Sequence, residues 1–131
     1  MKSIFSKIID HQIPAHIIAE DDYFIAFLDI NPLSVGHTLV VPKQEVDYFF
    51  DLDDLLMAQI MVFSKRVAAA IKKATGCRRV GVAVIGFEVP HAHLHLVPMN
   101  GMSDINFANP KLKLNQDELA ETAKKIKFLF K

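Results

Sequence analysis

Histidine alternates with apolar residues in one short segment, and this alternation constrains the fold more than any other feature. Residues 91–96 read HAHLHL, so three of the six histidines fall within five positions. Strand side chains point to opposite faces in turn, and positions two apart lie about 6.6 Å apart on one face. The pattern predicts a strand over residues 92–97, with Ala92, Leu94 and Leu96 in the core and the imidazoles of His91, His93 and His95 in a row on the other face.

The rest of the chain favours an α+β fold. Apolar spacing predicts a short helix over residues 3–10 and strands over 17–20, 23–28, 37–41 and 79–85. An apolar stripe predicts a long core-facing helix over 53–74, ended by Gly76. A capping-box pattern, Asn115 to Glu118, begins a terminal helix over 115–131.

These elements predict one domain, residues 1–131, with the terminal helix as an extension. Because the connections are short, we expect about five strands to pair in an antiparallel sheet. The sequence leaves two places open for the terminal helix, which would either complete a dimer or cap a pocket.

Charge and composition restrict the classes of partner. Fifteen basic residues balance fifteen acidic ones, so the net charge gives no reason to expect nucleic-acid or membrane binding. Lys2, Lys7 and Asp10 interrupt the first residues before a signal peptide or a membrane span could form. Cys77 is the only cysteine, which favours a reducing compartment. We therefore expect a cytoplasmic protein.

Three interpretations of the alternating histidines compete. They could fill a solvated strand face, or two of them could ligate zinc with help from Asp29, Glu88 or His37, although no spacing singles out such a set. The third interpretation is phosphorus chemistry without a metal or cofactor, which we favour. Imidazole has a pKa of about 6.5, so a ring with one nitrogen held by an acceptor, such as a backbone carbonyl, can use the other as a nucleophile. A ligand over the central ring, His93, would then contact all three imidazoles.

The segment HAHLHLV is similar to the signature of the histidine triad (HIT) family, His-x-His-x-His followed by two apolar residues. IFSKII, IP, EDD and AFLDINPLSVGHTLVVPK resemble the N-terminal half of its nucleoside phosphoramidase branch, often called Hint. The resemblance covers most of residues 3–98. It implies a HIT-like fold, a homodimer, and a hydrolase or transferase that cleaves a bond to the α-phosphate of a purine nucleotide.

The resemblance also implies roles for individual residues. His93 matches the nucleophile that forms a nucleotidyl-histidine intermediate, and His95 and His37 match residues that contact phosphate oxygens. His91 matches the residue whose main chain orients the nucleophile, and Asp29 matches the acid that binds the ribose hydroxyls. The apolar clamp around the purine would be formed by Phe27, Ile30, Ile4, Phe5 and Ile8.

The sequence departs from the family pattern in two places. Ser3 and Ser6 stand where some relatives carry a zinc-binding Cys-x-x-Cys, and since hydroxyls are poor zinc ligands we expect no structural metal there. Before the triad, GFEVP is shorter than the loop of most relatives, with Phe87 in place of a glutamine and Glu88 in place of a small hydroxyl residue. Glu88 could donate a proton to the leaving group, select a cationic leaving group, or face solvent.

The leading substrate class is therefore the adenosine 5'-phosphoramidates. Diadenosine polyphosphate hydrolysis and nucleotidyl transfer remain as alternative activities. From a different class, a non-catalytic nucleotide-binding partner protein would also fit, because the altered GFEVP segment puts turnover in question.

Overall fold

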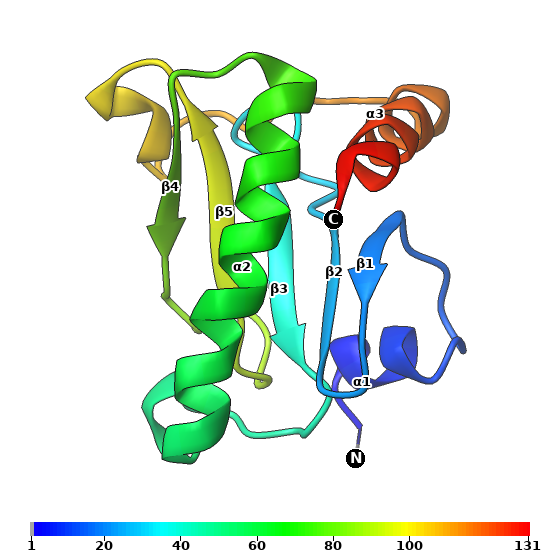
Figure 1. The fold of residues 1–131 in the computed structure, drawn as a ribbon, viewed down its shortest axis with the longest axis vertical. Helices are drawn as coiled ribbons and strands as arrows, with labels where there is room; N and C mark the ends of the chain where they lie inside the picture. Colours follow the sequence, from blue (N-terminus) through cyan, green and yellow to red (C-terminus); the bar gives the residue numbers. More distant parts are fainter. Residues whose placement is uncertain (1) are drawn as a thin grey trace.

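The framework of the protein is an antiparallel sheet of five strands in the order β1-β2-β3-β5-β4 (Figure 1). It is seen in a computed structural model that describes residues 2–131. The predicted α+β class with about five strands is confirmed. The strands are β1 (Ile17–Glu20), β2 (Phe24–Leu28), β3 (Thr38–Pro42), β4 (Arg79–Ala83) and β5 (Leu94–Met99).

Three α-helices accompany the sheet within residues 2–131, and a side-chain cap marks where each of them begins. They are α1 (Ile4–Ile9), α2 (Asp54–Thr75) and α3 (Gln116–Leu129). Helix α2 begins where the Asp53 side chain accepts the N–H of Leu56, and it ends at Gly76, which adopts the left-handed conformation (φ 70°) that glycine tolerates best. Helix α3 begins with the reciprocal bonds between Asn115 and Glu118 that the capping box predicts. No helix within residues 2–131 is long and apolar enough to cross a membrane.

Apolar side chains form separate clusters on the two faces of the sheet. Helices α2 and α3 cover one face, and α1 lies on the other near the start of the chain (Figure 1). The larger cluster lies under α2 and includes Leu94 and Leu96, as the alternation predicts. The smaller one contains Phe5, Ile8, Ile25, Phe27, Leu39 and Val41.

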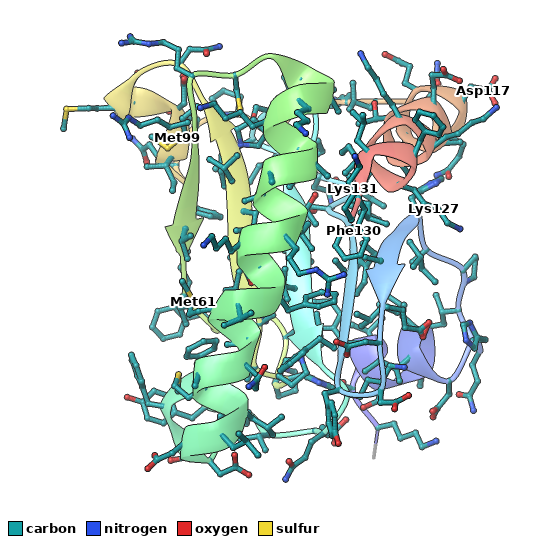
Figure 2. All side chains as sticks on the ribbon, in the orientation of Figure 1. Met61, Met99, Asp117, Lys127, Phe130 and Lys131 are labelled. Atoms are coloured by element: carbon teal, nitrogen blue, oxygen red, sulfur yellow. The ribbon has the colours of Figure 1, made fainter. Side chains whose placement is uncertain are left out.

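The terminal helix packs into the core of its own chain. Leu119, Ala123 and Ile126 of α3 belong to the larger cluster, so the helix packs against α2, β1 and β2. Its last residues turn back toward α2 (Figure 2), where the Arg66 side chain donates to the carbonyl of Lys131 and stacks over the Phe130 ring. Helix α3 therefore helps to build the core.

Strand β5 begins two residues later than predicted, and this changes the setting of the histidines. The N–H of His91 donates to Val89 O and the N–H of Ala92 donates to Val46 O, so neither joins the sheet ladder. Only His95 lies within β5. The prediction of three histidines in one row of the ladder is therefore wrong, and β4 likewise ends at Ala83 rather than at residue 85.

Candidate active site

Four histidines gather on the face of the sheet opposite α2. His95 lies there because it alternates with Leu94 and Leu96, which pack under α2. His37 immediately precedes β3, the strand paired with β5, and His91 and His93 precede β5 itself. All four are at most 9% exposed. The fold therefore joins side chains more than fifty positions apart into one polar cluster.

The ring of His93 is fixed by a bond to the backbone. Its Nδ1 lies 2.7 Å from the carbonyl oxygen of His91. Because a carbonyl only accepts, Nδ1 carries the proton and Nε2 keeps its lone pair. Burial lowers the pKa of His93, although the bond to His91 and the nearby charge of Glu88 oppose the shift. The ring is therefore neutral at neutral pH, a state in which Nε2 can attack an electrophile.

His37 and His95 form a relay in which each tautomer is determined by its neighbour. The N–H of Leu33 donates to Nδ1 of His37 at 3.0 Å, so the proton of His37 must be on Nε2. That nitrogen lies 2.9 Å from Nδ1 of His95, which must accept. His95 consequently carries its proton on Nε2. This N–H is the donor that a phosphate oxygen would need.

Both rings of the relay are uncharged at neutral pH. Burial lowers the pKa of His37 to about 4, with a further contribution from the charge of Lys111. Burial also lowers the pKa of His95 to about 3, assisted by His37, His93 and Lys111. The two rings therefore form a neutral hydrogen-bond chain that can donate to a ligand.

Asp29 follows the last residue of β2 and joins this cluster. Its Oδ1 accepts the N–H of Asn31 at 2.8 Å, and its Oδ2 lies 3.6 Å from Nε2 of His37. Burial raises the pKa of Asp29, and the charge of Glu88 adds to the shift, whereas the Asn31 bond and Lys111 oppose it. The carboxyl is partly exposed, so it can accept hydroxyl hydrogens from a ligand.

Asp29, His37 and His95 also offer one ligand atom each within 4.8 Å of one another, which is a spacing that a metal ion could use. The tautomer of His37 argues against this use. A metal at Nε2 would need the ring proton on Nδ1, where it would meet the N–H of Leu33. The hydrogen bonds thus favour a hydrogen-bonded histidine pair over a metal centre.

His91 is held at both ring nitrogens by the protein. Its Nδ1 lies 2.7 Å from Ser3 Oγ and its Nε2 lies 2.8 Å from the carbonyl of Pro42. The ring is fully buried, so the expectation that a ligand over His93 would contact all three imidazoles is wrong. The Ser3 hydroxyl is engaged with His91 and the Ser6 hydroxyl with Glu45, so these residues do not fit a zinc site.

The residues predicted to form the purine clamp differ in burial. Phe5, Ile8 and Phe27 are buried in one cluster, and the Phe5 ring stands edge-on to His93 with centroids 5.0 Å apart. Ile4 and Ile30 are 50% and 59% exposed. A flat base would therefore meet exposed isoleucine side chains beside an aromatic cluster that is already packed.

Glu88 is exposed, as is Phe87, so the GFEVP segment lies at the surface. Its carboxylate is still close enough to raise the pKa of both Asp29 and His93. Glu88 therefore places a charge at the exposed edge of the site.

Two residues of the site escaped the sequence analysis. The ring of Phe107 stands edge-on to His95 with centroids 4.8 Å apart, and Nζ of Lys111 lies 5.6 Å from the Phe107 centroid. The N–H of Leu112 donates to the carbonyl of Pro32, which ties this segment to the loop after Asp29. No motif marks these positions, and they lie beyond the part of the chain that the resemblance covers.

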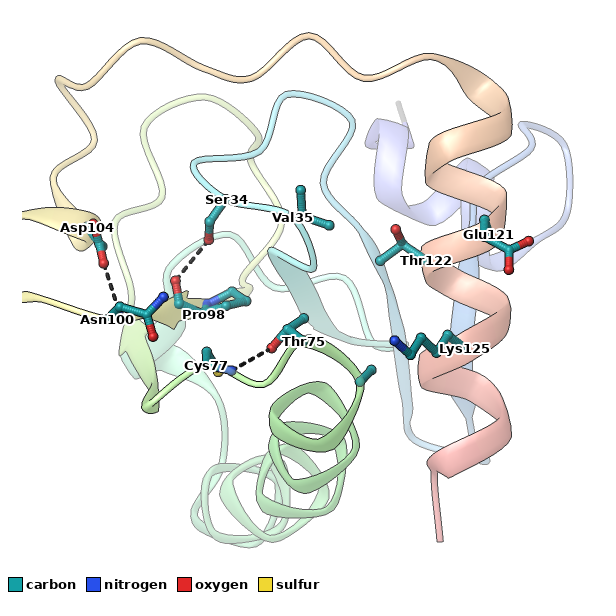
Figure 3. A pocket seen from close by; sticks show the side chains of 11 residues that line it. Ser34, Val35, Thr75, Cys77, Pro98, Asn100, Asp104, Glu121, Thr122 and Lys125 are labelled. Carbon is teal, nitrogen blue, oxygen red and sulfur yellow. Dashed lines mark hydrogen bonds between the residues drawn. The ribbon is translucent and has the colours of Figure 1, made fainter.

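A separate groove of about 630 Å³ lies between the end of α2, the end of β5 and α3 (Figure 3). Thr75, Cys77, Asn100, Glu121 and Lys125 are among its lining residues. Its lining, which falls entirely within the described chain, includes no histidine. The candidate active site is therefore the histidine cluster and not this groove.

Comparisons with known proteins agree with this geometry. The HIT domain family model matches residues 10–102. The chain is 34% identical over 131 residues to an uncharacterized HIT-like protein of Borreliella burgdorferi, with 94% of each chain covered. It is 38% identical over 96 residues to the adenosine 5'-monophosphoramidase HNT1 of Saccharomyces cerevisiae, which covers 72% of this chain and 61% of that protein.

Solved structures show the same fold. A Hit-like protein from Bartonella henselae superposes with a TM-score of 0.86 at 32% identity, covering 98% of this chain and 96% of that one. A Zn-bound histidine triad family protein from Mycobacterium smegmatis superposes with a TM-score of 0.80 at 27% identity, covering 98% and 93%. The chain belongs to the HIT domain family, whose members bind nucleotides and include hydrolases.

Proposed function

We propose that the protein is a cytoplasmic enzyme that cleaves purine nucleotidyl compounds of the adenosine 5'-phosphoramidate type at the α-phosphate. The observation that carries this proposal is the 2.7 Å bond between Nδ1 of His93 and the carbonyl of His91, which leaves a neutral ring with a free lone pair on Nε2. The yeast relative, a monophosphoramidase by name, supports the substrate class.

In the first step, Nε2 of His93 attacks the α-phosphorus. A phosphorus–nitrogen bond forms, the bond to the leaving group breaks, and the leaving group takes the electron pair and a proton from water. The hydroxide left behind is neutralised by the proton that the second step releases. The His93 ring now carries a positive charge, which the His91 carbonyl stabilises through Nδ1–H. The N–H of His95, aligned by His37, donates to a phosphate oxygen.

In the second step, water attacks the phosphorus of the nucleotidyl-histidine intermediate. The phosphorus–nitrogen bond breaks, its electron pair returns to Nε2, and the water proton passes to solvent. The nucleoside monophosphate leaves and His93 is again neutral. No metal ion or organic cofactor enters either step.

The remaining residues bind and select the substrate. Asp29 accepts the ribose hydroxyls, and Ile30 and Ile4 cover the purine together with the cluster of Phe5, Ile8 and Phe27. The exposed carboxylate of Glu88 favours a cationic leaving group such as an amine.

We also propose that two copies of the chain form a homodimer through the β4 edge of the sheet. Strand β4 pairs with β5 on one side only, so its other edge offers free backbone groups. Val82, Val84 and Ile85 at this edge are 39–47% exposed, and Met61 of α2 is directed toward the same side (Figure 2). Val82→Lys should yield a monomer in sedimentation velocity, and an unchanged sedimentation coefficient would contradict this interface.

Turnover of an adenosine 5'-phosphoramidate by the wild type and by His93→Ala, with and without a chelator, tests the activity. We expect turnover by the wild type, a loss on the order of a thousandfold or more in the variant, and no effect of the chelator. His16→Ala, which changes a histidine bonded to Gln116 away from the cluster, is the matched control.

The other outcomes discriminate between the alternatives. Activity that the chelator abolishes would indicate a metal enzyme. Faster cleavage of a diadenosine polyphosphate than of the phosphoramidate would identify that class as the substrate. Micromolar binding of AMP without turnover of either compound would indicate a nucleotide-binding partner protein.

A further inference from the structure

A hydrogen-bond network joins the start of α1 to the residue that holds His93. Glu45 lies in the loop after β3. Its Oε1 accepts two hydrogen bonds of 2.7 Å, one from the backbone N–H of Ser3, which caps α1, and one from the hydroxyl of Ser6 within α1. Ser3 Oγ in turn lies 2.7 Å from Nδ1 of His91. Three separate segments of the chain, at residues 3–6, 45 and 91, therefore meet in one network.

Each hydrogen of this network has a defined direction. A carboxylate only accepts, so the Ser6 hydroxyl donates to Glu45 and has no second proton for His91, from which it lies 3.4 Å away. The Ser3 hydroxyl accepts the N–H of Ser6 and is left to donate to Nδ1 of His91. Since Pro42 O accepts at the other ring nitrogen, His91 is the Nε2–H tautomer.

The network ends at the nucleophile proposed above. The peptide that joins His91 to Ala92 supplies the carbonyl that accepts Nδ1–H of His93. This peptide is held from two sides, because the N–H of Ala92 donates to the carbonyl of Val46, the residue after Glu45, and the side chain of His91 is fixed at both ring nitrogens. Helix α1 adds a second constraint, because the Phe5 ring stands edge-on to both imidazoles, with centroids 6.0 Å from His91 and 5.0 Å from His93. The start of α1 is thus part of the support of the site.

We propose that Glu45 is a positioning residue of the reaction: through Ser3 and Ser6 it fixes the ring of His91, and thereby the orientation and the Nδ1–H tautomer of His93. This inference rests on the proposed function, because it assigns Glu45 a part in presenting the nucleophile. The carboxylate remains ionised over the working pH range, since the Ser6 and Ser3 bonds lower the pKa of Glu45 to about 2.

Two variants of Glu45 separate its bonds from its charge. Both serine bonds reach the same oxygen, so Glu45→Gln can keep them through its amide oxygen and remove only the charge. Glu45→Ala removes both bonds and frees the Ser6 hydroxyl to compete with Ser3 for His91. We expect Glu45→Ala to lower kcat about 10–100-fold, as loss of a supporting contact does elsewhere, with a less than about threefold change in KM. Glu45→Gln should stay within about threefold of the wild type in kcat.

The decisive readout is the tautomer of His93, measured by long-range ¹H–¹⁵N NMR correlations of the imidazole nitrogens. We expect a single Nδ1–H form in the wild type and in Glu45→Gln, and a mixture of tautomers in Glu45→Ala. Ser3→Ala, which removes the donor to His91, should reproduce the mixture. Far-UV circular dichroism shows whether each variant is folded, and Ser3→Ala provides the test if Glu45→Ala does not fold.

Two results would overturn the proposal. One is an unchanged His93 tautomer in folded Glu45→Ala and Ser3→Ala, even if kcat falls, because that would reduce the network to general structural support. The other is a wild-type kcat in both variants. The NMR measurement needs no substrate, so a wild-type protein without turnover would refute the proposed function while the effect of Glu45 on the His93 tautomer could still be observed.

Discussion

The buried relay of His37 and His95 should make the protein lose stability in mild acid. The two rings are 1% and 9% exposed, and burial is the main cause that lowers their pKa values to about 4 and about 3. In the unfolded chain both have a pKa of about 6.5. Between these values the unfolded state binds protons that the folded state does not, so unfolding becomes more favourable as the pH falls below about 6.5.

The magnitude follows from these pKa values. Between pH 7 and pH 5 the unfolded state gains about 0.7 proton at each ring, while the folded state gains almost none. Each histidine therefore removes about 2 kcal/mol from the free energy of unfolding, and the pair about 4 kcal/mol. Since domains are typically stable by about 5–15 kcal/mol, this is a large share of the total.

Urea unfolding followed by circular dichroism at pH 7 and pH 5 measures the effect. We expect His95→Asn to lose about 2 kcal/mol less than the wild type between the two pH values. The variant will be less stable at pH 7, because asparagine is smaller than histidine and does not fill the same buried space, so only the difference between the two pH values is compared. Thr38→Val is the control, since it alters a buried neighbour on β3 without removing a titratable group. Equal losses for the wild type and His95→Asn would refute the reasoning.

Two further predictions concern charges at the edge of the site. Because Glu88 raises the pKa of His93, Glu88→Gln should move the acidic limb of the kcat/KM profile to lower pH and leave the alkaline limb in place; movement of the alkaline limb would instead show that Glu88 donates a proton. Because Lys111 lowers the pKa of His37 and His95, Lys111→Met should raise the pH at which their ring resonances titrate in NMR, whereas an identical titration would place the ammonium too far away to act.

Most of the fold could be predicted from the sequence because its signals are local. The apolar stripe and the glycine stop determine α2, and the capping box determines the start of α3. The start of β5 could not be predicted this way. Alternating side chains continue through residues 91–93, but the N–H groups of His91 and Ala92 bond to Val89 and Val46 outside the ladder. The point at which β5 begins to pair depends on its register with the neighbouring strands. The sequence of one strand alone does not determine this register.

The composition of the candidate site was predictable to a similar degree. The alternation and the GHTLVVP segment identify four histidines, which the fold does bring together. The contacts of Phe107, Lys111 and Glu45 were not predictable, because each reaches the histidines from a distant segment without a characteristic spacing. Sequence patterns therefore identified the candidate reactive side chains better than the residues that hold them in place.

The roles of the histidines differ because the backbone groups around them differ. A carbonyl faces Nδ1 of His93 and makes that nitrogen a donor, whereas an N–H faces Nδ1 of His37 and makes that nitrogen an acceptor. The N–H of Leu33 also determines the tautomer of His95, although the two residues share no hydrogen bond. It places the proton of His37 on Nε2, which donates to Nδ1 of His95, so that His95 carries its own proton on Nε2. Every residue except proline has a backbone N–H, and every residue has a carbonyl. The bonds that fix the tautomers therefore cannot be predicted from the identities of the side chains. In the proposed mechanism, identical side chains thus serve as nucleophile, donor and support according to which backbone group the fold places opposite each ring nitrogen.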